Sequence, residues 1–323
     1  MTIFPMPNTS QTGLTEVGNG VYAYVQPNTQ TSWGWSNAGL ITSGPTSLLV
    51  DTLYTLAHTQ KMLDAMRAAV PAAASIDVLV NSHADPDHTF GNQLVGGAQI
   101  IATRNAAEDM QVNLTPDQVR AIVANTDELG IGGQFFARLC APFDLSGIEL
   151  VLPTETFTGR KTLQVGEKSV ELIDLGPAHT RGDLIVFVPD DRVVFVGDLL
   201  FSGSHAVLWS GPMSNWTRAC DVILDLEADV VVAGHGPLSD KAGLREFRDY
   251  LKYVETEATA MHARGLSVKQ AARTIDLSAY AHWLDPERIV LAIDTVYKGL
   301  DGKTDAPDYL TLFGEMAEYA EEL

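Results

Sequence analysis

The chain has 323 residues, of which 46% are apolar and 19% are charged, a composition typical of folded globular proteins and too apolar for a disordered chain. The formal net charge is −20, which argues against nucleic acid and anionic membranes as partners, because both repel a negative surface. The two cysteines, Cys140 and Cys220, form no CxxC pair and indicate no disulfide framework. No signal peptide and no membrane-spanning apolar run is recognisable, so we expect a cytoplasmic protein. With nucleic acid and membranes disfavoured, we expect its partner to be a small-molecule substrate.

The first hundred residues alternate short apolar segments with one amphipathic segment. Residues 55–70 predict a helix, because apolar side chains recur on one face and Pro71 ends the pattern. The apolar segments predict strands at 20–25, 37–41, 47–51, 76–80 and 98–102. Strands that alternate with helices are typical of α/β proteins.

Residues 103–160 interrupt this alternation with three predicted helices, at 105–111, 116–125 and 135–139. A segment of this length between strands is an insertion, and insertions often form the walls of a site. Its apolar side chains are candidates for a substrate wall, namely Leu114, Val119, Ile122, Phe135 and Phe136.

The strand pattern resumes at 162–164, 169–174, 184–188, 193–197 and 229–232, with a helix at 214–226. Asp190 and Asp191 predict a hairpin turn between the third and fourth of these strands. Four helices are then predicted, at 241–262, 268–275, 286–300 and 309–321. We therefore expect one α/β domain over residues 1–240 and a helical extension over residues 241–323.

Four potential metal ligands lie within six residues, directly after the predicted strand 76–80. They are His83, Asp85, Asp87 and His88. A loop at the end of a strand can direct several side chains at one centre, and imidazole and carboxylate groups suit zinc, iron and manganese. Surface runs of His and Asp also arise by chance, so this segment alone leaves metal binding open.

Three further residues of ligand type lie near the ends of other predicted strands. His179 lies between two strands, and Asp198 and His235 each follow an apolar strand directly. One histidine at a strand end is usually only a polar loop residue. Four such loops in one α/β pattern favour a shared metal site.

Together these motifs resemble the metallo-β-lactamase superfamily. The matching segments are His83 to His88, His179 in GPAHTRGD, Asp198 in VVFVGDLLF and His235 in AGHGP, while Asn37 and Asp51 stand where the family has its early core strands. The resemblance covers residues 17 to about 240 and implies a four-layer αββα sandwich. It also implies two metal positions, one with His83, residue 85 and His179, the other with Asp87, His88 and His235, bridged by Asp198.

The chain departs from the family pattern at Asp85, where the family has histidine. A retained carboxylate ligand would favour iron or manganese over zinc, since these ions prefer hard oxygen donors, and relatives with an acidic residue here include diiron proteins. Alternatively Asp85 turns away and the first position is weak or empty. We expect two divalent ions, with zinc first and iron or manganese as alternatives.

The expected activity is hydrolysis of an ester, thioester or lactone of a small, fairly apolar substrate by a metal-bound hydroxide. Asp87 would orient the nucleophile or transfer a proton, or act as a ligand only. His205 would face the pocket as a second catalytic residue, or be a solvated loop histidine.

Other interpretations stay open. They are a diiron oxygenase, a Lewis-acid cyclase or dehydratase of natural-product biosynthesis, and a metal-free binding protein. The C-terminal helices could close over the site, cap the sandwich or form a homodimer contact. Trp33, Trp35, Trp209 and Trp216 could line the site or pack in the core, and Arg181 could hold an anionic group or form a surface ion pair.

Overall fold

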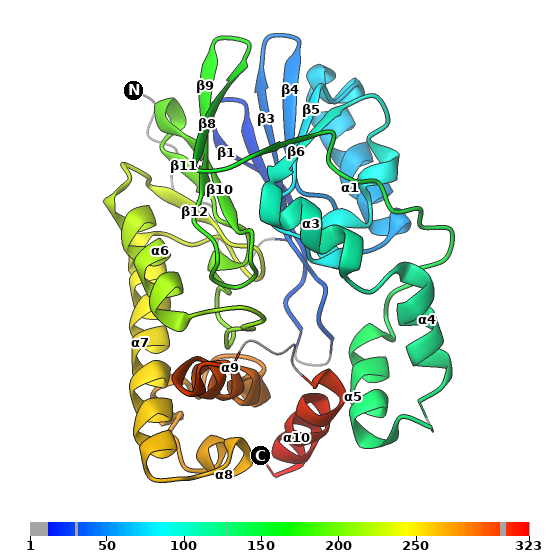
Figure 1. The fold of residues 1–323 in the computed structure, drawn as a ribbon. Coiled ribbons are helices and arrows are strands. Elements are labelled where there is room, and N and C mark those ends of the chain that lie inside the picture. The colour runs from blue at the N-terminus through cyan, green and yellow to red at the C-terminus, as the bar shows by residue number, and fades with distance from the viewer. Residues whose placement is uncertain (1–11, 30–31, 127, 304–307, 323) are drawn as a thin grey trace.

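The computed structural model describes residues 12–29, 32–126, 128–303 and 308–322. Two β-sheets pack face to face, and helices cover the outer face of each sheet (Figure 1). The predicted four-layer αββα sandwich is therefore confirmed, including its helical insertion and its C-terminal helices. Within the described residues no helix is both long and apolar enough to cross a membrane.

The first sheet has seven strands in sequential order. Its first four strands pair antiparallel, and the pairs from β4 to β7 are parallel. The parallel part brings the carboxyl ends of neighbouring strands to one edge of the sheet. The strands are β1 (Gly13–Gly18), β2 (Val21–Val25), β3 (Ala38–Ser43), β4 (Thr46–Val50), β5 (Val78–Val80), β6 (Gln99–Thr103) and β7 (Glu155–Phe157).

The second sheet has five strands in the order β12-β11-β10-β9-β8. Strands β10 and β11 pair antiparallel across the predicted turn, and Arg192 takes the positive φ that this turn requires. Strand β12 pairs parallel to β11, so their carboxyl ends also meet. The strands are β8 (Arg160–Val165), β9 (Lys168–Asp174), β10 (Leu184–Val188), β11 (Val193–Phe195) and β12 (Val230–Val232).

Alternating side chains along the strands form two cores on opposite sides of each sheet. In β4, Leu48 and Val50 point between the sheets, whereas Leu49 packs against helix α1 (Leu56–Ala69) on the outer face. In the second sheet Val186 points inward and Ile185 outward. Because side chains alternate with a period of two, continuous apolar strands are buried on both faces.

The insertion forms helices α3 (Arg104–Val112), α4 (Pro116–Ala124) and α5 (Gly130–Cys140). Helix α5 begins five residues before its predicted start. Its first turn holds three glycines, whose low helix propensity hides the start of the helix in the sequence. Gly132 is required there for another reason. A Cβ atom on Gly132 would lie 2.1 Å from the Leu310 carbonyl oxygen of α10 (Tyr309–Glu321), so its absence lets the two helices pack side by side (Figure 1).

The C-terminal helices share one apolar core with the outer face of the second sheet. Phe247 and Ile293 belong to the same buried cluster as Ile185 and Trp216. The helices are α6 (Met213–Asp225), α7 (Lys241–Ala263), α8 (Val268–Ala272) and α9 (Ile289–Asp301). They cap the sandwich on this face, as one of the predicted alternatives had it, whereas the boundary at residue 240 stays a prediction.

Glu287 in the short helix η6 (Pro286–Arg288) is only 7% exposed. Burial, together with the charge of Asp285, raises the pKa of its carboxyl to about 7 from an ordinary 4.5. The folded chain therefore binds this proton more tightly than the unfolded chain, and stability falls as pH rises through this range. We expect Glu287→Gln to be more stable than wild type at pH 8, by up to about 3 kcal/mol, but nearly equal to wild type at pH 4.5.

Urea denaturation at both pH values checks this expectation. The exposed Glu128, changed to Gln, is the control and should leave stability unchanged at either pH. An equal difference between Glu287→Gln and wild type at both pH values would contradict the assignment.

Candidate metal centre

The seven predicted ligands come from four loops that meet at one edge of the two sheets. His83 follows β5, and Asp85 is the N-cap of the four-residue helix α2 (Pro86–Thr89), which carries Asp87 and His88. His179 lies between β9 and β10, Asp198 follows β11, and His235 follows β12. Their ligand atoms form two clusters, His83/Asp85/His179/Asp198 and Asp87/His88/His235.

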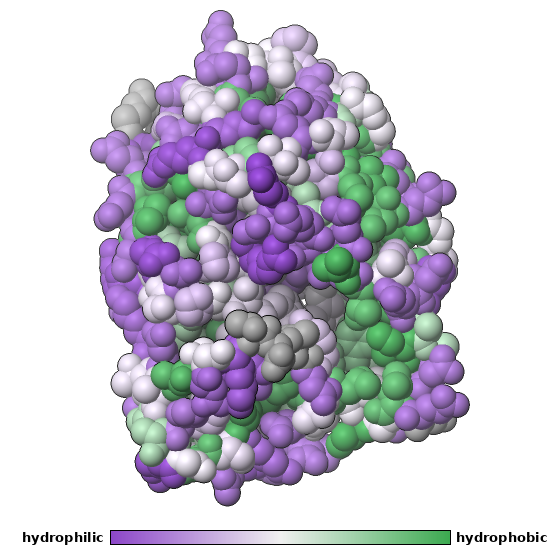
Figure 2. All heavy atoms as spheres, viewed as in Figure 1, coloured by the Kyte–Doolittle hydropathy of each residue, from purple (hydrophilic) through white to green (hydrophobic). Residues whose placement is uncertain are grey.

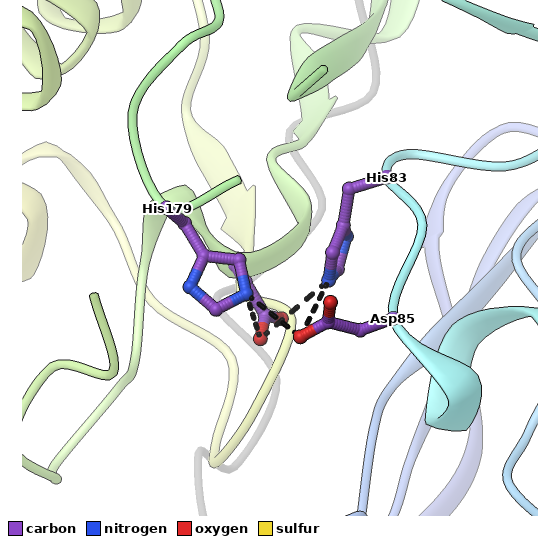
Figure 3. Close-up of side chains that lie close together, drawn as sticks. His83, Asp85 and His179 are labelled. Carbon is purple, nitrogen blue, oxygen red and sulfur yellow. Dashed lines mark hydrogen bonds and ion pairs between the residues drawn. The ribbon is translucent and has the colours of Figure 1, made fainter. Parts of the chain in front are cut away.

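In the first cluster, side chains from separate loops point toward one another (Figure 3). Asp85 Oδ2 lies 3.1 Å from His179 Nε2 and 3.8 Å from His83 Nε2. Asp198 Oδ2 lies 3.4 Å from His179 Nε2 and 3.8 Å from His83 Nε2. Asp85 therefore points into the cluster, and the predicted alternative in which it turns away does not describe this structure.

The second cluster lies on the other side of Asp198. His235 Nε2 is 3.3 Å from Asp87 Oδ2 and 3.4 Å from His88 Nε2. Asp198 Oδ1 lies 3.1 Å from His88 Nε2, and its Oδ2 lies 3.2 Å from His235 Nε2. The carboxylate of Asp198 thus contacts histidines of both clusters, as expected for a bridging ligand.

Asp51 organises two of the histidines without belonging to either cluster. Its Oδ1 accepts a hydrogen bond from Ser82 N, and its Oδ2 accepts from Ser82 Oγ and lies 3.0 Å from His88 Nδ1. Ser82 Oγ in turn lies 2.9 Å from His83 Nδ1. A carboxylate only accepts hydrogen bonds, so this network places protons on Nδ1 and leaves the Nε2 lone pairs facing the clusters.

From the sequence, Asp51 is predicted only to stand where the family has an early core strand. The sequence offers one signal, since Asp51 directly follows the apolar run of β4; the positive φ of 61° is seen only in the structure. Such a backbone conformation is uncommon outside glycine, and the hydrogen bonds of Asp51 to Ser82 help to hold it here.

Two other contacts fix the remaining histidine loops. His179 Nδ1 lies 2.7 Å from the Val207 carbonyl oxygen, which again leaves Nε2 for the cluster. Asn37 holds the loop of His235 by donating from Nδ2 to the carbonyls of Ala233 and Gly236. A Cβ atom on Gly234 would lie 2.0 Å from Asp198 Oδ1, so only glycine permits this close approach.

Burial and neighbouring charges strongly shift the pKa values of the residues in the two clusters. Burial lowers the pKa of His83 to about 3. Burial also acts to lower the pKa of His179 and His235, but the carboxylates beside them outweigh it and raise both pKa values to about 9. Burial tends to raise the pKa of Asp198, yet His235 and His88 hold it well below its ordinary value. At neutral pH the raised pKa values keep protons on His179 and His235, and a metal ion bound through their Nε2 atoms would displace these protons.

The donor spacing fits metal ions. In a tetrahedral site with bonds of about 2.1 Å, neighbouring donor atoms lie about 3.4 Å apart, and the donor pairs described above lie 3.1 to 3.8 Å apart. His83 Nε2 and Asp198 Oδ1 are buried and make no hydrogen bond, although Asp198 Oδ1 lies close to His88 Nε2. Buried polar atoms normally have partners, and a metal ion at each cluster would provide them.

His205 lies outside both clusters. Its ring is fully buried, with Nδ1 3.0 Å from the Tyr250 hydroxyl and an edge contact to Trp283. Burial, with the charge of Arg288, lowers its pKa to about 4. The interpretation as a solvated loop histidine is therefore wrong, because these contacts pack His205 against the C-terminal helical region, whereas its catalytic role stays a prediction.

The four tryptophans have different surroundings. Trp209 Nε1 donates to Asp85 Oδ2 at 2.9 Å, so this residue reaches the first cluster directly. Trp33 packs against Phe135 and Phe313. Trp35 packs against His58 and Phe143, and Trp216 is a core residue whose Nε1 donates to the Leu199 carbonyl.

The remaining candidates divide between surface and core. Arg181 forms ion pairs with Glu108 and Asp109 of α3, which is the surface role among its two predicted alternatives. Among the proposed wall residues, Val119 and Phe135 are buried in cores, Ile122 and Phe136 are half-buried, and Leu114 is exposed.

Comparisons with known proteins agree with this architecture. The stereoselective inverting sec-alkylsulfatase Pisa1 from Pseudomonas sp. superposes with a TM-score of 0.67 at 17% identity over 89% of this chain. This chain spans only about half (50%) of the length of that protein. A metallo-β-lactamase from Pontibacter korlensis gives 0.55 at 18% identity, over 75% of this chain and 99% of its own. The family model of the metallo-β-lactamase superfamily matches residues 32–235, a range that contains all seven candidate ligands. The chain therefore belongs to the metallo-β-lactamase superfamily.

Proposed function

We propose that the protein is a metal-dependent hydrolase that holds two divalent ions. The first ion would be held by His83, Asp85 and His179, the second by Asp87, His88 and His235, with Asp198 shared between them. The observation that carries this proposal is the pair of donor clusters around one buried carboxylate, with metal-like spacing and two unpartnered atoms.

Divalent ions in such a site lower the pKa of a bound water to about 7 and polarise a carbonyl or similar group. The protein buries one side of the site and leaves carboxylates accessible to solvent on the other side. Asp85, Asp87 and His235 are the most exposed of the seven residues, at 18%, 14% and 11% of their side chains. The substrate would therefore approach from their side, where Asp87 is placed to orient the nucleophile or to hold a proton.

Apolar side chains near this open side support an apolar substrate. Tyr309 contacts Trp209 edge to face at 5.5 Å, and Trp209 is bonded to Asp85. Ile131, Tyr309 and Leu310 are each more than two-fifths exposed, and Figure 2 shows hydrophobic side chains gathered where α5 and α10 lie. A small ester, thioester or lactone with an apolar portion fits these surroundings, and alkyl sulfate esters belong in the same panel because of the alkylsulfatase likeness.

Elemental analysis of the purified protein, beside Asp85→His, tests the proposal. We expect close to two zinc ions per chain in both, and hydrolysis of at least one member of the ester, thioester, lactone and sulfate panel. A chelator should abolish this activity and added zinc should restore it. A chain that binds no metal under any reconstitution would overturn the proposal.

A diiron oxygenase is a second candidate, favoured by one observation. Asp85 supplies a hard oxygen donor to the first cluster, 3.1 Å from His179 Nε2, and such donors favour iron or manganese. About two iron ions per chain, with an absorption band that changes on adding oxygen, would place this function ahead of hydrolysis.

A further inference from the structure

We infer that Trp209 is a positioning residue that holds Asp85 in place as a ligand, and that the C-terminal helices in turn hold Trp209. The inference rests on the proposed metal binding. Asp85 has the most exposed side chain of the seven candidate ligands, so water competes for it and its carboxylate is the one most free to rotate. Trp209 opposes this freedom, because its Nε1 donates to Asp85 Oδ2 at 2.9 Å.

The indole of Trp209 can support a metal ligand but cannot be a metal ligand itself. Its N–H is a donor only, so Trp209 cannot itself bind a metal ion. It occupies part of the acceptor capacity of Oδ2, the same atom that lies 3.1 Å from His179 Nε2 and 3.8 Å from His83 Nε2. The hydrogen bond therefore keeps this oxygen between the two imidazoles, where a metal ion would find three donors at once.

Trp209 is attached to His179 through the backbone. The nitrogens of Trp209 and Ser210 both donate to the His179 carbonyl, at 3.0 and 3.1 Å, and Gly211 N donates to the Ala178 carbonyl at 2.8 Å. The Val207 carbonyl is the partner of His179 Nδ1. Residues 207–211, which we call the strap, thus carry the orientation of one histidine ligand and one carboxylate ligand together.

The C-terminal helical region holds the strap and the residues that lead into it. Thr295 Oγ1 of α9 donates to the Leu208 carbonyl at 3.1 Å, and Arg288 Nη1 donates to the His205 carbonyl at 3.0 Å. Tyr309 of α10 packs its ring against Trp209. The contacts of Thr295 and Tyr309 lead to His179 and Asp85 of the first cluster. In the second cluster, His88 is held by Asp51 and the loop of His235 is held by Asn37.

Metal titration of Trp209→Phe tests the inference, since phenylalanine keeps a ring beside Tyr309 and removes the N–H. Using Co²⁺ alone as the probe, we expect two binding events in wild type. In the variant one event should weaken by about 10- to 100-fold, the usual effect of removing an outer partner of a ligand, and the other should stay unchanged. The cobalt absorption bands of the weakened position should shift as well. Trp35→Phe is the matched control, because it removes another indole hydrogen bond, to Ser32 Oγ, that involves none of the seven candidate ligands.

Two further variants keep the inference testable if Trp209→Phe folds poorly. Thr295→Val removes only the hydroxyl contact to the strap and should weaken the same binding event to a smaller degree. In an Asp85→Ala background, Trp209→Phe should cause no further loss, because the two residues act through one another. Equal loss of both binding events, or none, would overturn the inference. A wild-type chain that binds no cobalt at all would instead overturn the proposed function.

Discussion

Replacing Asp198 with asparagine should remove both metal ions and reduce hydrolysis by at least roughly 1000-fold, the scale seen when an essential catalytic group is removed. Asparagine keeps the size of Asp198 but loses its charge and one acceptor oxygen. That carboxylate contacts His179 in one cluster and His235 and His88 in the other, so both clusters lose a donor together. Metal content per chain and steady-state rates measure the effect.

The exposed Asp190, changed to asparagine, is the control for Asp198→Asn and should keep two ions and full activity. Retention of two tightly bound ions by Asp198→Asn would show that Asp198 bridges nothing. Loss of one ion alone would assign this carboxylate to a single cluster.

Asp51→Asn should lower the affinity for metal by about 10- to 100-fold and the free energy of unfolding by about 1–3 kcal/mol, although Asp51 is not a ligand. Its Oδ2 accepts from Ser82 Oγ and lies beside His88 Nδ1. If the amide nitrogen of asparagine took the place of Oδ2, it would face the Ser82 hydroxyl and the His88 Nδ1–H, which are both donors. These buried groups would then lack an acceptor, and the tautomer of His88 would no longer be fixed. Competition with a chromophoric chelator and urea denaturation give the two quantities.

Asp77→Asn is the matched control for Asp51→Asn. Asp77 is exposed and accepts a backbone hydrogen bond from Ser47, which the amide oxygen of asparagine can also accept. It should change neither metal affinity nor unfolding. An Asp51→Asn chain with unchanged metal affinity would mean that the Nε2 atoms face the clusters without help from this network.

The sandwich could be predicted because its strands carry their own signal. Apolar runs such as 184–188 are buried on both faces, and turn residues bound them clearly. Strand β7 was missed because it has three residues and is at most half-buried, so its sequence shows no run of apolar residues. The predicted start of helix α5 was five residues too far along the chain for a different reason, since Gly132 serves the contact with Leu310 rather than local helix stability.

The candidate ligands could be predicted because strand ends bring them together, and their residue types are those that metals prefer. What surrounds them could not be predicted. The bond from Trp209 to Asp85 spans 124 positions, and no local pattern connects the two residues. The burial of His205 could not be predicted for the same reason, since its contact with Tyr250 depends on a helix far along the chain.

The crossing of α5 with α10 has a consequence for how the protein is made. Contacts between distant parts of a chain form late, and chains are synthesised from the N-terminus. All seven candidate ligands, at positions 83 to 235, precede residues 309–321. All seven positions have therefore been synthesised while α5 still lacks its partner. The pairing of α5 with α10, and with it the contact of Tyr309 with Trp209, is completed only after the residues of α10 have left the ribosome.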